Sequence, residues 1–349
     1  MIYFTPGPSE LYPTIKYHLQ AAIENNIASL SHRSEKFRTI YRETAESLRR
    51  LLDIPRDFNI FFVSSATEAM EIAARNCVEK YSAHFVDGAF GEKFFEIARA
   101  VKKESVKLNI GEIEKIPREL ELICFTHSET STGTYVPLEN IYETRKNFPR
   151  ALIAVDIVSS VPYVDLDFKM VDFVFFSVQK GFGLPAGLGI IIANQKAIDK
   201  ANYLQNKSFD IGGWNNLPAL AKKAASFETP ATPNVLNIYL LGKICEDLKK
   251  IGVQMIRKEI DTKARMVYNA FDRHPTFNPA IKDGRVRSQT VITIDTGRAT
   301  EEMVGKLAAN GFVMGRGYGD KKNSQIRIAN FPAHQIGDLK KMLDLFLHK

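Results

Sequence analysis

The sequence predicts an α/β protein with a large domain, built on a mostly parallel seven-stranded sheet, and a smaller C-terminal α/β domain. From about residue 59 to 193, short β-branched or aromatic runs alternate with amphipathic helical stretches, a pattern typical of parallel strands joined by helices. After about residue 234, two long helical stretches precede a shorter unit of strands and helices. The length of 349 residues fits two domains, since about 150 residues is usual for one.

The strands expected in the large sheet are short, rich in β-branched or aromatic residues and separated by turns or helical segments. They are residues 59–64, 83–87, 105–109, 120–126, 151–156, 172–177 and 188–193. Helices are expected where apolar residues recur at helical spacing, at residues 68–78, 92–102 and 138–145. Crossovers of this kind are right-handed, so the helices should cover the two faces of the sheet.

The C-terminal part of the chain predicts a second, smaller unit. Long helices are expected at residues 234–251 and 254–271, strands at 290–294 and 325–329, and helices at 300–310 and 333–347. We therefore expect a large domain at residues 15–245 and a small domain made of residues 1–14 and 246–349. The sequence has no repeat and no low-complexity linker, so the domains should pack closely.

Hydropathy gives no sign of a membrane protein. The most apolar runs, such as residues 173–176 and 190–193, are far shorter than the roughly 18 residues that a membrane-spanning helix needs. The first residues lack a basic segment and reach Pro-Gly-Pro at residues 6–8 before any apolar run, which argues against a secretory signal. The sequence therefore predicts a cytoplasmic protein with no membrane partner.

Cysteine usage and charge exclude other classes of protein. Cys77, Cys124 and Cys245 are odd in number, far apart and in no Cys-x-x-Cys pair, which argues against disulfides and a structural metal site. Lysine and arginine exceed aspartate and glutamate by 47 − 40 = 7, but acidic residues are interleaved with the basic ones. This pattern favours small anionic substrates, and it predicts no nucleic-acid partner.

A lysine that follows a hydrophobic strand directly is the most informative residue of the chain. Lys180 precedes a loop with four glycines, which leaves room beside its amine for a bulky ligand. Poor solvation lowers the pKa of an amine and makes it a nucleophile toward aldehydes, the chemistry of a Schiff base. The alternative is an ordinary surface lysine at the end of a strand.

An acidic residue ends another strand of the same predicted sheet. Asp156 follows a run of apolar residues, and the carboxyl edge of a parallel sheet is where such folds bind ligands. This carboxylate needs a cationic partner, and a protonated pyridinium nitrogen would provide one. A helix cap or a metal ligand is the alternative, and no second acidic residue nearby supports a metal.

The segment after the first strand of the large sheet predicts an anion site. Free backbone N–H groups at Ser65, Ala66 and Thr67 would point from a helix N-terminus toward a phosphate. Ser65 and Glu68 also fit a plain capping box. Phe90 lies in a following loop between small residues and suits stacking on a flat heterocycle, although an isolated phenylalanine is more often part of a core.

Taken together, these segments resemble the class V aminotransferases, which are pyridoxal-phosphate enzymes of fold type I. The residues that carry the resemblance, in order and spacing, are Ser65, Ala66, Thr67, Phe90, Asp156 and the Ser-x-Gln-Lys-Gly run that contains Gln179 and Lys180. The resemblance covers nearly the whole chain. It implies the PLP-dependent transferase fold, pyridoxal 5'-phosphate as cofactor, amino acids and keto acids as substrates, and a homodimer with shared active sites.

The resemblance also implies roles around the cofactor ring. Lys180 would hold the cofactor as an internal aldimine and act as general base and acid, which gives ping-pong kinetics. Asp156 would pair with the ring nitrogen, and Phe90 would stack on the ring where many relatives have tryptophan. Thr130 and Gln179 would contact the ring or its phenolic oxygen.

The same resemblance implies which residues hold the cofactor phosphate. Ser65, Ala66 and Thr67 would bind it, and Thr229 of the second subunit would add a further contact. Glu228 stands where many relatives have asparagine before that threonine, which is a departure from the family pattern.

Three residues are expected to bind the substrate. Arg327 lies on a predicted C-terminal strand, where the family keeps a two-pronged clamp for the substrate carboxylate, although a surface arginine is the alternative. The Ser-His-Arg-Ser run that contains His32 and Arg33 resembles phosphoserine aminotransferases, in which this pair faces the substrate phosphate. The leading substrate pair is therefore phosphoserine and 2-oxoglutarate, the transamination of serine biosynthesis.

The alternative is an enzyme of the alanine-glyoxylate or serine-pyruvate type, which acts on unphosphorylated amino acids. Phosphoserine aminotransferases usually have histidines just before the carboxylate arginine, whereas this chain has Arg316, Lys321 and Lys322, which are candidates to replace them. We expect the loop at residues 315–319 to be a mobile lid. A cysteine desulfurase is disfavoured because no cysteine follows Cys245, and a nicotinamide or flavin oxidoreductase lacks the expected Gly-x-Gly-x-x-Gly run.

Overall fold

Seven strands form the larger sheet in the computed structural model, which describes residues 1–112, 115 and 119–347. In spatial order they are β2 (Phe58–Val63), β10 (Gly189–Asn194), β9 (Phe173–Ser177), β8 (Leu152–Asp156), β5 (Leu122–Thr126), β3 (Tyr81–Phe85) and β4 (Glu104–Leu108). β10 runs antiparallel to both of its neighbours, and the other four pairings are parallel. The predicted mostly parallel seven-stranded sheet is therefore confirmed.

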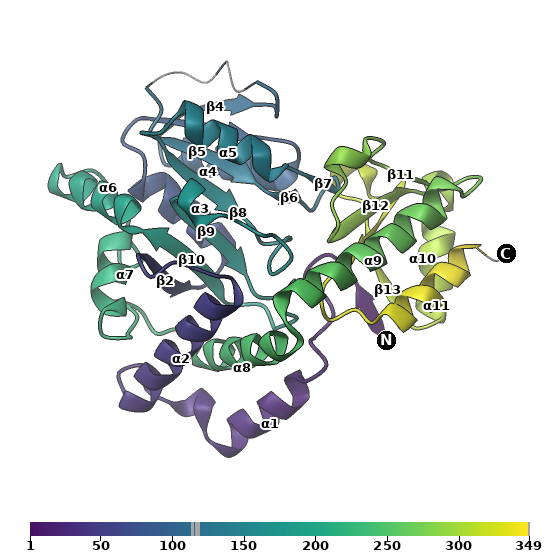
Figure 1. Cartoon of the computed structure of the whole chain (residues 1–349), viewed down its shortest axis with the longest axis horizontal. Coiled ribbons are helices and arrows are strands. Elements are labelled where there is room, and N and C mark those ends of the chain that lie inside the picture. The colour runs from purple at the N-terminus through teal and green to yellow at the C-terminus, as the bar shows by residue number, and fades with distance from the viewer. Residues whose placement is uncertain (113–114, 116–118, 348–349) are drawn as a thin grey trace.

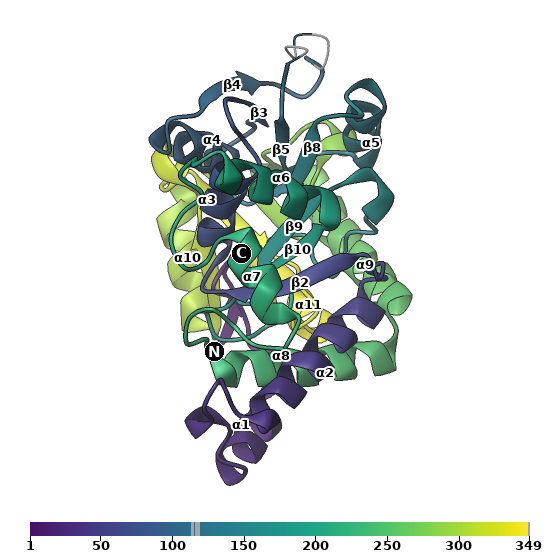
Figure 2. The ribbon, with the colours of Figure 1, turned by 90° about the vertical axis from the view of Figure 1, so that its left-hand side faces the viewer.

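The central strands of this sheet are apolar because helices cover both of their faces. Every residue of β8 and β9 is buried. The helices packed around the sheet in Figures 1 and 2 are α3 (Ala66–Asn76), α4 (Ala89–Ala100), α5 (Leu138–Asn147), α6 (Gln195–Asn206) and α7 (Leu217–Ala224). The first three match the predicted helices, and α3 begins earlier than expected because Ser65 caps it.

A second sheet lies in the C-terminal part of the molecule. Its strands, in spatial order, are β1 (Ile2–Phe4), β13 (Phe312–Arg316), β14 (Gln325–Ala329), β12 (Val291–Asp295) and β11 (Asn278–Pro279). The long helix α9 (Val253–Asp272) leads into this region, where α10 (Thr300–Ala309) and α11 (Ile336–Leu347) pack on the sheet (Figure 1). Phe4 and Phe271 belong to its separate hydrophobic core, so the N-terminal strand is part of this unit.

The N-terminal helices were not predicted. α1 (Ile15–Glu24) and α2 (Glu35–Leu51) precede the large sheet, and α2 packs along α8 (Val235–Ile251). Gly242 allows the two helices to approach closely because it has no side chain. A Cβ at this position would lie only 2.5 Å from Thr44 Oγ1. This close helix pair lies in the lower part of the molecule in Figure 1, above α1.

Short elements complete the fold. A hairpin of β6 (Ser128–Glu129) and β7 (Thr134–Tyr135) follows β5. Single 3-10 turns occur at η1 (Ile27–Ser29), η3 (Phe168–Met170), η4 (Gly284–Val286), η5 (Gly297–Ala299) and η6 (Gly319–Lys321). Among the helices of the described ranges, none has the length and apolar character needed to cross a membrane. The domain division at residues 14 and 245 stays a prediction, and its second boundary falls inside α8.

Candidate active site

A cavity of about 600 Å³ lies at the carboxyl ends of β2, β5, β8 and β9 and faces β13 and β14 of the second sheet. This is the edge at which parallel sheets bind ligands. The predicted site residues that line it are Ser65, Ala66, Thr67, Phe90, Thr130, Asp156, Gln179, Lys180 and Arg327. The structure therefore brings together residues that are up to 262 positions apart in the chain, since 327 − 65 = 262.

The amine of Lys180 is buried in this cavity among hydroxyl groups. Its Nζ donates to Thr130 Oγ1 at 3.0 Å and to Ser159 Oγ at 2.9 Å. Burial lowers the pKa of Lys180, and the charge of Asp156 offsets only part of that effect. A lysine with a lowered pKa is neutral, and therefore nucleophilic, at a lower pH than a lysine in water.

The N-terminal segment packs directly against the side chain of Lys180. A Cβ placed on Gly7 would lie 2.5 Å from Lys180 Cε, and Gly7 has a φ of +137°, which side chains rarely adopt. Thr5, Pro6 and Gly7 also line the cavity. The Pro-Gly-Pro run is thus part of the wall that holds the lysine.

We expect Gly7→Ala to misplace Lys180 and to lower turnover about 100-fold, because small displacements of reacting groups are costly. The measurement is steady-state turnover together with the amount of cofactor bound to the purified protein. Gly252→Ala is the matched control, since Gly252 also has a positive φ, +90°, but within the described ranges no atom beyond its own chain neighbours lies within 4 Å of its added Cβ. Equal losses in both variants would assign the effect to backbone strain and not to Lys180.

Asp156 is a buried carboxylate that lacks a cationic partner. It is the last residue of β8, and its Oδ1 accepts a hydrogen bond of 2.8 Å from the backbone N–H of Val158. Across the described ranges its carboxylate forms no ion pair within 4.0 Å, and burial raises its pKa. A protonated ring nitrogen would supply the missing positive charge, so this residue fits pyridoxal phosphate.

The start of α3 lines the same cavity. Ser65 Oγ accepts from the backbone N–H of Glu68 at 3.1 Å, so the capping alternative is present. The N–H of Ala66 donates to Ser177 Oγ at 2.7 Å. The N–H of Thr67 has no partner in the described part of the chain, which leaves one first-turn donor for an anion. The role of these residues in binding phosphate stays a prediction.

Phe90 lies beside the lysine. Lys180 Nζ is 5.1 Å from the centroid of the Phe90 ring. The buried carboxylate of Glu129 holds the start of α4, because its Oε2 accepts from the N–H groups of Phe90 at 3.0 Å and Gly91 at 3.1 Å. A flat ring could therefore enter between Phe90 and the hydroxyl groups around Lys180.

Arg327 is fixed on one side by backbone carbonyls. Its Nε donates to Arg316 O at 2.7 Å and its Nη1 donates to Thr130 O at 3.1 Å. The ring of Tyr318 lies 5.5 Å from the guanidinium carbon of Arg327, and its centroid is 5.9 Å from that of Phe90. The guanidinium is thus held in a fixed orientation at the cavity wall, as a carboxylate clamp requires.

The three candidate cations before Arg327 have different environments. Arg316 and Gly315 belong to strand β13, and the Arg316 guanidinium is paired with Glu301, with 2.9 Å between Nη2 and Oε1. Arg316 and Lys322 line the cavity, whereas Lys321 is not among the lining residues. Of the cations that line the cavity here, Lys322 forms no ion pair within the described ranges, whereas Arg316 is paired with Glu301.

His32, Arg33 and Thr229 do not line the cavity of the single chain. Arg33 and Thr229 nevertheless lie together, because Arg33 Nη1 donates to Thr229 O at 3.3 Å and to Glu228 Oε2 at 2.7 Å. Arg38 Nη2 and Lys223 Nζ donate to the same carboxylate, at 2.6 and 3.1 Å. We call the group of Arg33, Arg38, Lys223 and Glu228 the arginine cluster.

The cations of the arginine cluster act on its acid mainly through the hydrogen bonds that they donate. Arg38, Lys223 and Arg33 lower the pKa of Glu228 to about 2. Because Glu228 stays ionised at any physiological pH, it fixes the position of Arg33 beside Thr229. Three cations therefore balance the negative charge of Glu228.

Sequence patterns missed several residues of the site. Ser159 and Thr126 line the cavity, and Thr126 Oγ1 is buried with no hydrogen-bond partner among the described residues. Glu129 and Ser177 orient the backbone of α4 and α3. These residues lie at or just after the ends of strands, but no sequence motif or regular spacing marks them as site residues.

The chain is similar in sequence to known proteins along almost its whole length. The family model described as Aminotransferase class-V matches residues 4–87 and 92–321. A putative phosphoserine aminotransferase of Mycobacterium leprae is 28% identical over 358 residues, covering 98% of this chain and 92% of the relative. The crystal structure of a phosphoserine aminotransferase from Cytophaga hutchinsonii is 41% identical with a TM-score of 0.96, covering 100% of this chain and 98% of the other.

A more distant structure shares the fold. A PLP-bound phosphoserine aminotransferase from Trichomonas vaginalis is 19% identical with a TM-score of 0.81, and each chain is covered to 100%. The two-sheet architecture therefore occurs in a known fold of PLP enzymes.

Proposed function

Since the chain belongs to the aminotransferase class-V family and is therefore a PLP-dependent transaminase, we propose that it transfers the amino group of phosphoserine to 2-oxoglutarate. The observation that carries this substrate assignment is the 41% identity, across the whole chain, with a protein described as a phosphoserine aminotransferase. The cations at and near the cavity support it, because a phosphorylated donor brings more negative charge than an ordinary amino acid.

In this proposal the cofactor occupies the cavity around Lys180. Ser65, Ala66 and Thr67 would bind its phosphate, Phe90 would stack on its ring, and Thr130 and Gln179 would contact its edge. When bound, pyridoxal phosphate supplies an electron sink for negative charge at the substrate α-carbon. Asp156 would keep the ring nitrogen protonated, and Lys180 would hold the cofactor.

Lys180 also moves the proton that the reaction requires. Once the amino group of the donor has displaced it from the cofactor, the free Nζ would accept the proton from the substrate α-carbon as a general base and later give it up as a general acid. The hydroxyls of Thr130 and Ser159, at 3.0 and 2.9 Å, orient the amine for this step. The same residues serve both half-reactions, which predicts ping-pong kinetics.

Arg327 binds the α-carboxylate of either substrate, since its guanidinium is already oriented by two carbonyls. The phosphate of the donor and the second carboxylate of 2-oxoglutarate lie at the opposite end of each substrate from the carboxylate that Arg327 binds. We propose that Lys322 on the cavity wall, together with His32 and Arg33, binds this second anionic group.

We further propose that His32, Arg33 and Thr229 act in the active site of the partner subunit of a homodimer. These residues lie outside the cavity of their own chain, and Arg33 contacts Thr229 directly. If Thr229 reaches the cofactor phosphate of the partner, Arg33 reaches the same site with it. A two-fold dimer would then contain two shared active sites.

A cytoplasmic location belongs to the same proposal. Cys77, Cys124 and Cys245 are free and buried, and burial raises their pKa values. Free thiols of this kind are usual in a reducing compartment.

The substrate assignment is tested by single-turnover conversion of the bound cofactor to its amine form. Phosphoserine should react faster than serine and alanine, and glutamate should react as the donor of the reverse transfer. If serine or alanine reacts as well as phosphoserine, the proposal is wrong and an enzyme for unphosphorylated amino acids is supported.

Two arginine variants should separate the binding of the two ends of the donor. Arg327→Ala should lower kcat/KM about 100- to 1000-fold for every donor, because it leaves each carboxylate unpaired. Arg33→Ala should lower it about 10- to 100-fold for phosphoserine and little for alanine, because it removes one charged hydrogen bond to phosphate. An equal loss with phosphoserine and with alanine in Arg33→Ala would contradict this division.

A further inference from the structure

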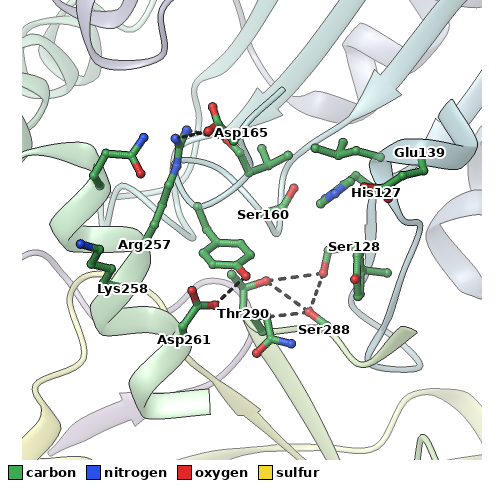
Figure 3. A pocket seen from close by; sticks show the side chains of 16 residues that line it. His127, Ser128, Glu139, Ser160, Asp165, Arg257, Lys258, Asp261, Ser288 and Thr290 are labelled. Atoms are coloured by element: carbon green, nitrogen blue, oxygen red, sulfur yellow. Dashed lines mark hydrogen bonds and ion pairs between the residues drawn. The ribbon is translucent and has the colours of Figure 1, made fainter. Parts of the chain in front are cut away.

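A second cavity, of about 390 Å³, adjoins the cavity around Lys180, and Ser128 lines both of them. It is bounded by the β6–β7 hairpin and α5 on one side and by α9 on the other, with residues 288–290 below (Figure 3). Its volume is within the usual range for small-molecule sites, about 300–1000 Å³. None of the residues assigned to the cofactor or the substrate lines it.

The floor of this cavity is buried and polar. Ser128 Oγ lies 2.8 Å from Ser288 Oγ and 3.5 Å from Thr290 Oγ1, so the three hydroxyl groups form one cluster. Hydroxyl groups can rotate to donate or accept, and a polar ligand can therefore join this network. An apolar molecule would leave these groups without solvent or partner.

Two nitrogen-containing side chains of the wall have unused hydrogen-bonding capacity. His127 is 4% exposed and its Nδ1 has no partner in the described part of the chain. Arg257 is 9% exposed, its Nη2 donates to Val164 O at 3.0 Å, and its Nη1 lies 2.9 Å from Asp165 Oδ2. The Nε of Arg257 has no hydrogen-bond partner among the described residues. Native proteins pair nearly all such groups, so these two residues indicate a polar molecule that completes the site.

Charges of both signs stand at the rim on opposite sides. Lys258 of α9 and Glu139 of α5 line the cavity from opposite sides (Figure 3), and neither has an ion-pair partner among residues 1–112, 115 and 119–347. Asp261, which lies near Lys258, accepts a hydrogen bond of 2.7 Å from Tyr163 OH. Arg257 is already paired with Asp165. A ligand with only a negative charge would therefore be repelled by Glu139 and Asp261, and a ligand with only a positive charge would be repelled by Lys258. A molecule with one charge of each sign matches both walls.

We propose that this cavity is a second binding site, for a small amino acid in its zwitterionic form. The ligand carboxylate lies toward Lys258 and Arg257, and the ligand ammonium group lies toward Glu139. A polar side chain of the ligand, where there is one, reaches the hydroxyl cluster. The site is distinct from the cavity around Lys180 and does not depend on the substrate assignment.

The two cavities share a wall. Ser128 lines both of them, and Ser160 of the second cavity follows Ser159, whose Oγ accepts from Lys180 Nζ at 2.9 Å. A ligand in the second cavity therefore touches the segments that orient the reactive lysine.

Calorimetric titration of the holoenzyme with L-alanine, propionate and ethylamine tests the proposal. Propionate lacks the ammonium group of alanine and ethylamine lacks its carboxylate. L-Alanine should bind at the second site about tenfold or more tightly than either of them, and Lys258→Met or Glu139→Gln should weaken it about tenfold. Lys249→Met and Glu143→Gln, at other exposed positions of α8 and α5, are the matched controls and should bind as the wild type does.

Arg327→Ala separates this event from binding in the active-site cavity. Binding that survives Arg327→Ala and is weakened by Lys258→Met supports the second site, even if phosphoserine proves not to be the donor. If binding is lost in Arg327→Ala but unchanged in Lys258→Met and Glu139→Gln, the alanine binds in the active-site cavity and the proposal is overturned. Equal affinity for propionate and alanine would make the cavity an anion site and would also overturn it.

Discussion

Mixing the Lys180→Ala and Arg33→Ala variants should restore roughly a quarter of wild-type turnover of phosphoserine, although each variant alone is inactive or weakly active. Random exchange of subunits makes about half of the dimers hybrids. In a hybrid, one site combines the intact Lys180 of one chain with the intact Arg33 of the other, and the second site has lost both. The measurement is turnover before and after subunit exchange, with differently tagged chains to isolate the hybrid.

The matched control is a mixture of Lys180→Ala with Arg327→Ala. Both residues line the cavity of one chain, so no hybrid site contains the two intact side chains and no activity should return. If the Arg33 mixture also stays inactive while tagged hybrids form, Arg33 acts within its own chain or not at all. That outcome would contradict the shared active site and leave the family assignment untouched.

The strands of the large sheet could be predicted because they are buried on both faces and read as continuous apolar runs. The expected strand at residues 172–177 corresponds to β9, and the expected strand at 151–156 corresponds to β8. Residues 59–64 likewise correspond to β2. In such strands the local composition and the tertiary environment favour the same structure.

The N-terminal region could not be predicted in the same way. β1 has only three residues and is a strand because it pairs with β13, which lies more than 300 positions further along the chain. α2 is not among the predicted helices, although its buried positions, such as Phe37, Tyr41 and Leu48, recur at helical spacing. That periodic signal was available in the sequence, whereas the pairing of β1 was not.

The site shows the same division between local and tertiary information. Lys180 and Asp156 could be identified because each follows or ends a buried strand, where side chains at the carboxyl edge meet. Ser159 and Glu129 have no such signal, because their roles depend on which atoms the fold brings within hydrogen-bonding distance of Lys180 and of the start of α4. The contact between Arg33 and Thr229 depends on how two distant loops pack, and the sequence indicated each residue separately.

Replacing Asp156 with asparagine should lower turnover about 100- to 1000-fold while the fold is retained. Asparagine has the same shape, and its Oδ1 can still accept the hydrogen bond from Val158 N–H, which is 2.8 Å long in the wild type. Only the negative charge that would keep the cofactor nitrogen protonated is lost. The measurement is kcat with phosphoserine at saturating cofactor, and Asp156→Ala, which removes the hydrogen bond as well, separates charge from structure.

The same variant should be more stable than the wild type when no cofactor is bound. Burial raises the pKa of Asp156, and the positive charge of Lys180 offsets only part of this, so the native apoenzyme keeps the proton to a higher pH than the unfolded chain does. The free energy of unfolding contributed by Asp156 therefore falls as pH rises above the usual carboxyl range near 3.9. Asparagine does not ionise, so the Tm of apo Asp156→Asn should exceed that of the wild type at pH 8, and the difference should shrink toward pH 5.

Adding pyridoxal phosphate should reverse the order of the two Tm values, because the ring nitrogen supplies the cation that the carboxylate of Asp156 lacks. Identical melting of the two proteins at pH 8, with and without cofactor, would show that Asp156 is not the partner of that nitrogen.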